Sequence, residues 1–145
     1  MEQRLKLTDL GEGFQHVLAL EHHVRSRIDS ELLELVKLRA SMLNGCAHCI
    51  DMHSTEAMNN GEDVRRLFAL AAWRESAFFT DTELAALALT DAVTRLDEQG
   101  VPDDVFDAAV TAFGTEGVGD LALAIATINV WNRLAITAHA ETPAL

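Results

Sequence analysis

The spacing of apolar residues limits the fold of this chain more than any other feature, because they recur three and four positions apart along almost its whole length. Between Leu32 and Leu43, apolar side chains return at every helical turn. This period matches the α-helix, whereas the alternation expected of a half-buried strand is almost absent. Only two prolines and eight glycines interrupt the pattern. The sequence therefore predicts an all-α protein, a single-domain array of six to seven helices.

Capping and breaking residues predict where these helices begin and end. Ser and Asp accept the free amides at a helix start, and Asn-Gly pairs supply the left-handed residue that stops a helix. We expect helices over residues 8–27, 29–45, 46–58, 62–71, 82–97, 102–113 and 118–138. Residues 73–79 are expected to form a packed connector, and residues 141–145 a loose tail.

Length and charge narrow the class of protein. A chain of 145 residues is the size of one domain, here 1–145, and can bury a core without structural disulfides. Its 23 acidic and 11 basic residues give a formal charge of −12, which repels nucleic acid and anionic lipid. The longest apolar run, residues 121–128, is too short to span a membrane. The chain start lacks a signal peptide, so we expect a cytoplasmic protein whose cysteines stay reduced or cycle.

The last expected helix is apolar on nearly every side, and a helix of that kind must be covered all round. The other helices of so short a chain can hardly cover it alone, so the sequence predicts a homo-oligomer. The alternative is that this helix lies at the centre of a bundle. The polar run of Asn129, Asn132 and Arg133, with Trp131 between them, is expected to serve packing.

The candidate chemistry lies in the third expected helix, which carries both cysteines of the chain. Cys46, Cys49 and His53 are spaced three and four apart and therefore share one helix face. A helix start favours the thiolate, and a histidine one turn away can take the thiol proton. Cysteines three apart in a helical turn can also close a disulfide without a large movement.

Two further ionisable residues are candidates for this site. If the second and third helices form a hairpin about Asn44-Gly45, Glu34 comes level with His53 and can orient its imidazole. His48 lies between the cysteines and can reach the edge of a pocket. The alternative from pattern alone is that Glu34 is a solvated partner of Lys37 and His48 a surface residue. Asp51 and Glu56 are assigned to the solvated face.

Other chemistries remain open from the residues alone. Cys46, Cys49 and His53, with His48 or Glu34, are ligand types that zinc accepts. Three of them would come from one short helix, and no second Cys or His pair is present to complete a structural zinc site. A thioredoxin-type C-x-x-C lacks its βαβ surroundings. The two thiols could also be buried and inert.

The spacing Glu34, Cys46, Cys49, His53, with His48 between the cysteines, resembles the core motif of the alkylhydroperoxidase D (AhpD) family, within the carboxymuconolactone decarboxylase-like superfamily. The segments LRASMLNGCAHCIDMHSTEA, WRESAFFTDTE and INVWNRLAI extend the likeness over most of the chain. The resemblance implies an all-helical trimer or hexamer that reduces hydroperoxides with thiols.

The resemblance also implies the residue roles: Cys49 attacks the peroxide, Cys46 resolves the intermediate, and Glu34, His53 and His48 move protons. No bound cofactor and no metal are implied. The electrons are expected from an external dithiol, such as a lipoylated or thioredoxin-like reductant protein. Two alternatives remain, a decarboxylase-like lyase, whose members lack the cysteine pair, and a redox sensor that uses the pair without turnover.

Overall fold

The computed structural model describes residues 2–144, and every regular element in that range is helical. The prediction of an all-α fold is therefore confirmed for this part of the chain. The elements are η1 (Leu7–Leu10), α1 (Glu12–Arg27), α2 (Ser30–Asn44), α3 (Ala47–Asn59), α4 (Val64–Ala69), η2 (Leu70–Glu75), α5 (Asp81–Thr94) and α6 (Asp103–Ala138), where η marks a 3-10 helix.

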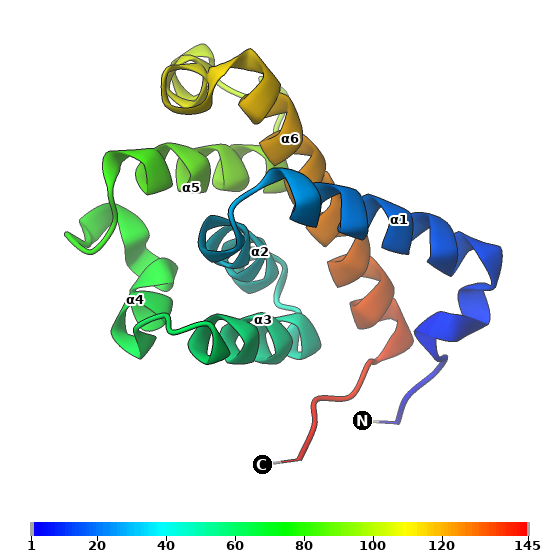
Figure 1. Ribbon diagram of the computed structural model, residues 1–145. Helices are drawn as coiled ribbons and strands as arrows, with labels where there is room; N and C mark the ends of the chain where they lie inside the picture. Colours follow the sequence, from blue (N-terminus) through cyan, green and yellow to red (C-terminus); the bar gives the residue numbers. More distant parts are fainter. Residues whose placement is uncertain (1, 145) are drawn as a thin grey trace.

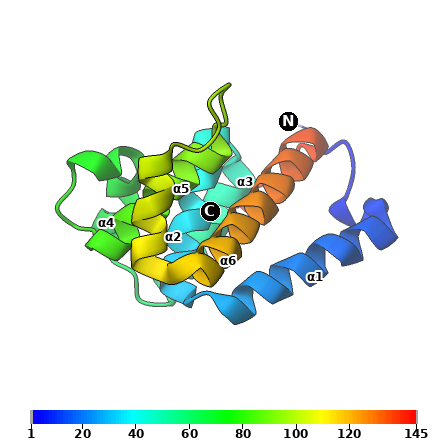
Figure 2. The same cartoon turned by 90° about the horizontal axis from the view of Figure 1, so that it is seen from above.

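Helix α2 lies at the centre of the molecule (Figure 1) and packs against α3, α5, α6 and η2. Residues 33–41 of this helix are all buried. Seen from above, α1 lies along α6 at one side of the molecule (Figure 2). The helix covered on all sides is thus α2, although four of its buried residues are polar or charged: Glu34, Lys37, Arg39 and Ser41.

The predicted helix ends agree with the structure where a capping residue fixes them. Asp29 caps α2 by accepting from the amides of Glu31 and Leu32, and Gly45 ends it with φ 69°. Thr80 and Glu83 form a capping box at α5. Other predicted ends were wrong, and α4, expected over residues 62–71, spans only Val64–Ala69. α1 begins only at Glu12, because Gly11 breaks the chain after η1, and α5 ends at Thr94 rather than at residue 97.

Helix α6 consists of two segments that meet at Gly114, where φ is 70° and ψ 170°. The break confirms the predicted helix end at residue 113, but the next segment follows directly after Gly114 and not at the predicted residue 118. By length and composition alone α6 could cross a membrane, with 44% of its most apolar window buried. A core helix of a soluble protein has the same composition, and α6 packs against α1, α2 and α5. The length and composition of α6 are therefore only weak evidence for a membrane span.

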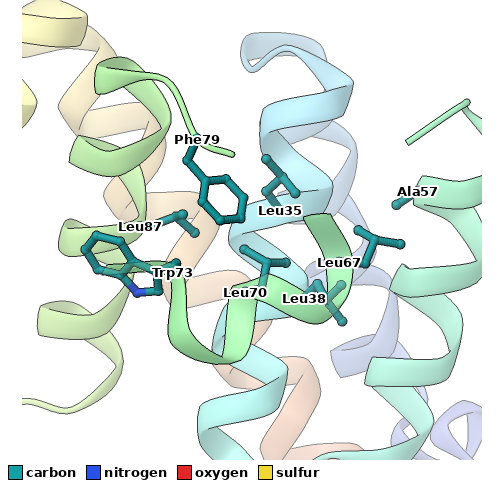
Figure 3. Close-up of a cluster of buried hydrophobic side chains, with 8 residues drawn as sticks. All are labelled: Leu35, Leu38, Ala57, Leu67, Leu70, Trp73, Phe79 and Leu87. Atoms are coloured by element: carbon teal, nitrogen blue, oxygen red, sulfur yellow. The ribbon is translucent and has the colours of Figure 1, made fainter. Parts of the chain in front are cut away.

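The apolar core continues from α2 into the connector between α4 and α5. Trp73 and Phe79 are both buried there, as predicted for a packed connector. Figure 3 shows these two rings gathered with side chains from α2, α3, α4, η2 and α5: Leu35, Leu38, Ala57, Leu67, Leu70 and Leu87.

A buried ion pair fastens this connector to α2 and α5. The guanidinium of Arg39 donates to both oxygens of Asp91, at 2.7 and 3.1 Å, and to the carbonyls of Leu70 and Ala71. Asp91 also accepts from Trp73 Nε1 and from Arg74. Burial raises the pKa of Asp91, but the hydrogen bonds and charges of Arg39 and Arg74 outweigh it and hold the pKa below its ordinary value.

The two ends of the chain meet, since the amide of Arg4 donates to the carbonyl of Ala138 at 2.9 Å. The predicted loose tail is irregular and exposed over residues 141–144, while Leu145 lies outside the described residues. Val130 and Ile136 on α6 remain 37% and 44% exposed. They agree with the expectation of an oligomer, which stays a prediction.

Candidate active site

The turn between α2 and α3 sets the position of the cysteine pair. Gly45 adopts the left-handed conformation, and the amide of Cys46 donates back to the carbonyl of Ser41 at 3.1 Å. Cys46 is thereby the N-cap of α3 rather than a residue of its first turn. Cys49 lies inside that turn, and both cysteines are 1% exposed.

Cys46 and Cys49 are joined by a disulfide, with their Cα atoms 5.3 Å apart. This separation lies within the usual range for disulfides, so the spacing argument from the sequence holds in three dimensions. The amide of Cys49 also donates to the sulfur of Cys46 at 3.4 Å. A helix start that donates to this sulfur favours its thiolate when the bond is broken.

His53 lies one turn after Cys49 and is held from behind by Glu34. Its Nδ1 is 2.8 Å from Glu34 Oε2, and the two residues are 2% and 1% exposed. A carboxylate only accepts hydrogen bonds, so we assign the proton to Nδ1. The other ring nitrogen, Nε2, is then a free acceptor, and it has no hydrogen-bond partner among the described residues. The alternative that Glu34 is a solvated partner of Lys37 is wrong.

A cavity of about 250 Å³ opens beside Cys49 and His53. Its walls come from η1, α1, α3 and α6, and most of them are apolar or aromatic. Trp131 and Phe14 meet edge to face there, with ring centroids 5.8 Å apart. Trp131 thus lines a cavity instead of serving packing alone. The lining residues are Leu7, Phe14, Leu18, Glu21, Arg25, His48, Cys49, Met52, His53, Trp131 and Ala135.

Charged side chains from three helices gather behind the cavity, and we call these five residues the charge cluster: Glu21, Arg25, Glu34, Lys37 and Glu56. Arg25 donates to both carboxylate oxygens of Glu56, and its Nη1 lies 3.3 Å from Glu34 Oε1. Glu56, whose side chain is 38% exposed, lies on the solvated face as predicted but also pairs with Arg25. Lys37 is fully buried and pairs with Glu21.

Burial and pairing act against each other in this charge cluster. Burial raises the pKa of Glu21, but Lys37 and Arg25 outweigh it, so the pKa lies below its ordinary value. Burial lowers the pKa of Lys37, and the partner Glu21 offsets only part of that effect. For Arg25, the carboxylates outweigh burial and raise the pKa further. Arg25 is charged in any case, and Glu21 and Lys37 stabilise each other's charged form.

Potential metal ligands differ from those expected. The groups whose ligand atoms lie within 4.8 Å of one another are Glu34, His53 and Glu56, whereas the sulfurs of Cys46 and Cys49 are bonded to each other. The guanidinium of Arg25 already places positive charge between the two carboxylates, at 3.0 and 3.3 Å. The Arg25 side chain thus compensates the negative charge of these two carboxylates.

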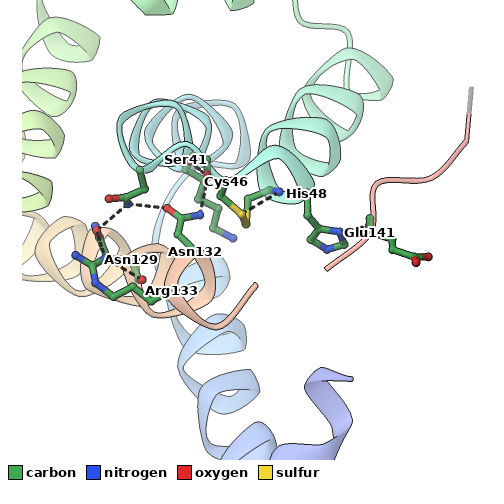
Figure 4. The surroundings of a disulfide bond; sticks show 10 residues. Ser41, Cys46, His48, Asn129, Asn132, Arg133 and Glu141 are labelled. Atoms are coloured by element: carbon green, nitrogen blue, oxygen red, sulfur yellow. Dashed lines mark hydrogen bonds between the residues drawn. A yellow bond between two sulfur atoms is a disulfide. The ribbon is translucent and has the colours of Figure 1, made fainter. Parts of the chain in front are cut away.

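The polar run on α6 fixes the approach of α2 to the cysteines (Figure 4). Asn44 donates to the side chains of Asn129 and Asn132, at 3.0 and 2.8 Å, and Asn132 donates to Ser41 at 3.0 Å. Arg133 donates to Asn129. These bonds tie the end of α2 to α6 just before the turn that carries Cys46.

His48 lies half-buried at the edge of the cavity, as the sequence suggested. Its Nδ1 is 2.7 Å from the backbone carbonyl of Glu141 (Figure 4). A carbonyl only accepts, so this nitrogen carries the proton and Nε2 is free to exchange one. The tail thereby sets the orientation of the His48 ring.

Comparison with known proteins gives the family. The model of the carboxymuconolactone decarboxylase family matches residues 8–92. The uncharacterized protein YdfG of Bacillus subtilis is 37% identical over 138 residues, which cover 94% of each chain. The chain belongs to the carboxymuconolactone decarboxylase family. The resemblance inferred from the cysteine motif is thus confirmed.

Two solved structures resemble this carboxymuconolactone decarboxylase family member over most of its length. An Agrobacterium tumefaciens protein of unknown function, proposed to be the antioxidant defence protein AhpD, superposes with a TM-score of 0.95 at 37% identity and covers 99% of this chain and 100% of its own. The debrominase Bmp8 has a TM-score of 0.82 at 20% identity, covering 95% and 75%. At that identity, the likeness to Bmp8 concerns the fold alone.

The sequence located the centre of the site but missed its surroundings. Glu34, His53 and Cys49 are brought together as expected. Glu21, Arg25 and Trp131 were not expected to contribute. The four-residue spacing of Glu21 and Arg25 on α1 is that of an ion pair within one helix. No local sequence pattern indicates that this pair lies next to Glu34.

Proposed function

We propose that this protein is a thiol-dependent hydroperoxide reductase with Cys49 as the attacking cysteine and Cys46 as the resolving one. One observation carries the proposal: Cys49 and His53 line the same cavity, and Glu34 holds His53 Nδ1 at 2.8 Å. The suggested antioxidant role of the Agrobacterium protein supports the same reading. Cys46, which does not line the cavity, suits the second step.

The first step is an attack on the peroxide. His53 Nε2 takes the proton of the Cys49 thiol, with Glu34 orienting the ring and stabilising the charged imidazolium. The thiolate attacks the distal peroxide oxygen, a sulfur–oxygen bond forms, and the oxygen–oxygen bond breaks. The departing alkoxide takes a proton from His53 or His48 and leaves as an alcohol. Cys49 is oxidised by two electrons to a sulfenic acid.

The second step closes the disulfide. The thiol of Cys46 attacks the sulfur of the Cys49 sulfenic acid, and the hydroxyl leaves as water with the thiol proton. In the closed pair the Cα atoms are 5.3 Å apart, which is within the ordinary range for a disulfide. An external dithiol then opens the disulfide by exchange and is itself oxidised. A lipoyl-type or thioredoxin-like donor has the required chemistry.

The cavity indicates the kind of peroxide. Its walls are mainly aliphatic and aromatic, with Phe14, Leu18 and Trp131 facing the space beside Cys49. Such a lining gains free energy by covering an apolar substituent. We therefore infer that organic hydroperoxides react faster than hydrogen peroxide.

A steady-state assay with dihydrolipoamide as donor tests the proposal, comparing cumene hydroperoxide with hydrogen peroxide. The wild-type protein should turn over many equivalents of cumene hydroperoxide. Cys49→Ser should be inactive, and Cys46→Ser should stop after one turnover with a sulfenic acid that dimedone traps. Oxidation of two thiols without turnover would instead indicate a redox sensor. Absence of any thiol loss would rule out both and favour a lyase of the kind that gives the family its name.

A further inference from the structure

We propose that the buried Glu21–Lys37 pair sets the electrostatic balance around His53 and thereby the pH range in which Cys49 reacts. Both are positioning residues, because they act through Arg25, Glu34 and His53. This inference rests on the proposed role of Cys49 as the nucleophile. It concerns residues that neither the cysteine motif nor the relatives assign to the reaction.

Glu21 connects three groups that would otherwise be independent. Its Oε1 accepts from Lys37 and, at 2.7 Å, from Arg25 Nε, while its Oε2 accepts from the indole of Trp131 at 3.2 Å. One carboxylate therefore neutralises a fully buried ammonium, orients a guanidinium and fixes an aromatic wall of the cavity. The Glu21 side chain is 12% exposed and that of Lys37 0%, so solvent screens their pairing weakly.

Arg25 connects Glu21 to Glu34, the residue that is hydrogen-bonded to His53. With Nε held by Glu21, its Nη1 lies 3.3 Å from Glu34 Oε1, and both terminal nitrogens bind Glu56. Glu34 Oε1 has no hydrogen-bond partner among the described residues, so the charge of Arg25 is its main compensation. The other oxygen, Oε2, is the one bound to His53.

The charge cluster places a net negative charge beside His53. It holds three carboxylates, Glu21, Glu34 and Glu56, against two cations, Arg25 and Lys37, so its net charge is minus one. A proton moved from Cys49 to His53 places a positive charge on the imidazole beside this cluster and leaves a negative charge on the Cys49 sulfur. Helix α6 contributes the uncharged Trp131, and His48 lies at the rim. Glu21 and Lys37 are the members shielded from solvent together with Glu34, so removing the charge of either should change the ease of proton transfer from Cys49.

Two substitutions should therefore act in opposite directions. Glu21→Gln removes a negative charge, and Lys37→Met removes a positive charge with a side chain of similar length. In a Cys46→Ser background, the alkylation of Cys49 by iodoacetamide measures its thiolate directly. We expect Glu21→Gln to shift the rate profile to lower pH, whereas Lys37→Met shifts it to higher pH and lowers the rate at pH 7 by about tenfold.

The double variant Glu21→Gln/Lys37→Met should return the profile toward that of the parent protein, because the net charge is restored. Glu116→Gln is the matched control, since it removes a carboxylate that pairs with Arg27 of α1 but lies outside the charge cluster. This control should leave the profile unchanged. If both single variants shift the profile in the same direction, or neither does, the inference is overturned.

The alkylation profile separates this inference from the proposed function. Opposite shifts in a protein that consumes no peroxide would keep the role of the charge cluster and reject the peroxidase. Normal peroxide turnover with superimposable alkylation profiles would reject the role of the charge cluster and keep the peroxidase. Circular dichroism of each variant establishes that the compared proteins are folded.

Discussion

At the scale of single residues, one hydrogen bond decides which nitrogen of His53 faces the cavity. Glu34 accepts from Nδ1 at 2.8 Å, inside a part of α2 that is completely buried. The acceptor nitrogen is therefore left without a partner next to the cavity that Cys49 lines. The carboxylate matters through its charge as well as its position, since an imidazolium forms beside it.

Glu34→Gln tests both contributions. The amide retains the shape of the side chain but lacks the charge, and its NH₂ group can stabilise the wrong tautomer of His53. We expect the rate of peroxide-dependent thiol loss to fall by about 100-fold or more. The measurement is stopped-flow mixing of the reduced protein with cumene hydroperoxide.

The matched control for this change is Glu31→Gln, the same substitution one turn earlier at an exposed position of α2. Its rate should equal that of the wild-type protein. A Glu34→Gln protein as fast as this control would show that the carboxylate has no part in the reaction.

At the scale of elements, α2 combines two tasks in one buried helix. Its Glu34 and Lys37 side chains are part of the charge cluster. Its Arg39 side chain bonds to Asp91 of α5 and to the connector between α4 and α5. Each buried charge on α2 is thus paired with a residue of another helix: His53 of α3, Glu21 of α1 and Asp91 of α5. The packing of these helices depends on those pairs, because an unpaired buried charge is costly.

Asp91→Asn should therefore destabilise the fold. Loss of the carboxylate leaves Arg39, 11% exposed at its side chain, without a counter-charge, and the expected cost is about 3 kcal/mol in the free energy of unfolding. Urea denaturation at pH 7 measures it. Asp107→Asn, the same change at an exposed site on α6, is the control and should be neutral.

The same pair predicts a pH dependence. The pKa of Asp91 is lowered in the folded protein, so its contribution to stability is complete above the unfolded pKa of about 3.9 and is lost as the pH falls through the lower folded value. The difference in unfolding free energy between wild type and Asp91→Asn should be constant above about pH 5 and shrink below about pH 4. A difference that grows on acidification would contradict the assignment.

The break in α6 depends on one glycine. Gly114 has φ 70° and ψ 170°, a region open essentially only to glycine, so Gly114→Ala should cost about 2 kcal/mol. Gly119 lies in regular helix with open space around it, so Gly119→Ala should be neutral or stabilise by up to about 1 kcal/mol. Thermal unfolding of the two variants compares them. Equal stability would mean that residue 114 adopts ordinary helical geometry in solution.

At the scale of the whole molecule, the sequence predicted those helix ends and turns that neighbouring residues determine. Helix starts followed from Asp29 and Thr80, and the Asn44-Gly45 stop set the hairpin that brings Glu34 level with His53. The walls of the cavity depend instead on how α1 lies on α6. The contact of Glu21 with Trp131 joins residues 110 positions apart, and no periodicity or cap specifies such a pairing. The pairing of Glu56 with Arg25 was not predicted for the same reason, because Arg25 lies on α1.

The assembly state belongs to this scale as well. Apolar side chains of Val130 and Ile136 on α6 are partly exposed, and an oligomer would cover them. Light scattering after size-exclusion chromatography should give a mass three or six times 15.8 kDa, and Ile136→Glu should lower it. A wild-type mass of a single chain would contradict the expected homotrimer or homohexamer.

The central claim is that His53, held by Glu34, activates Cys49 for reaction with a peroxide. Its most direct test is the rate at which the reduced protein converts one equivalent of cumene hydroperoxide to alcohol at pH 7, in the wild type and in His53→Gln. The account predicts one alcohol formed and two thiols lost per chain in the wild type, and a rate at least about 100-fold lower in the variant. Equal rates in the two proteins would contradict it.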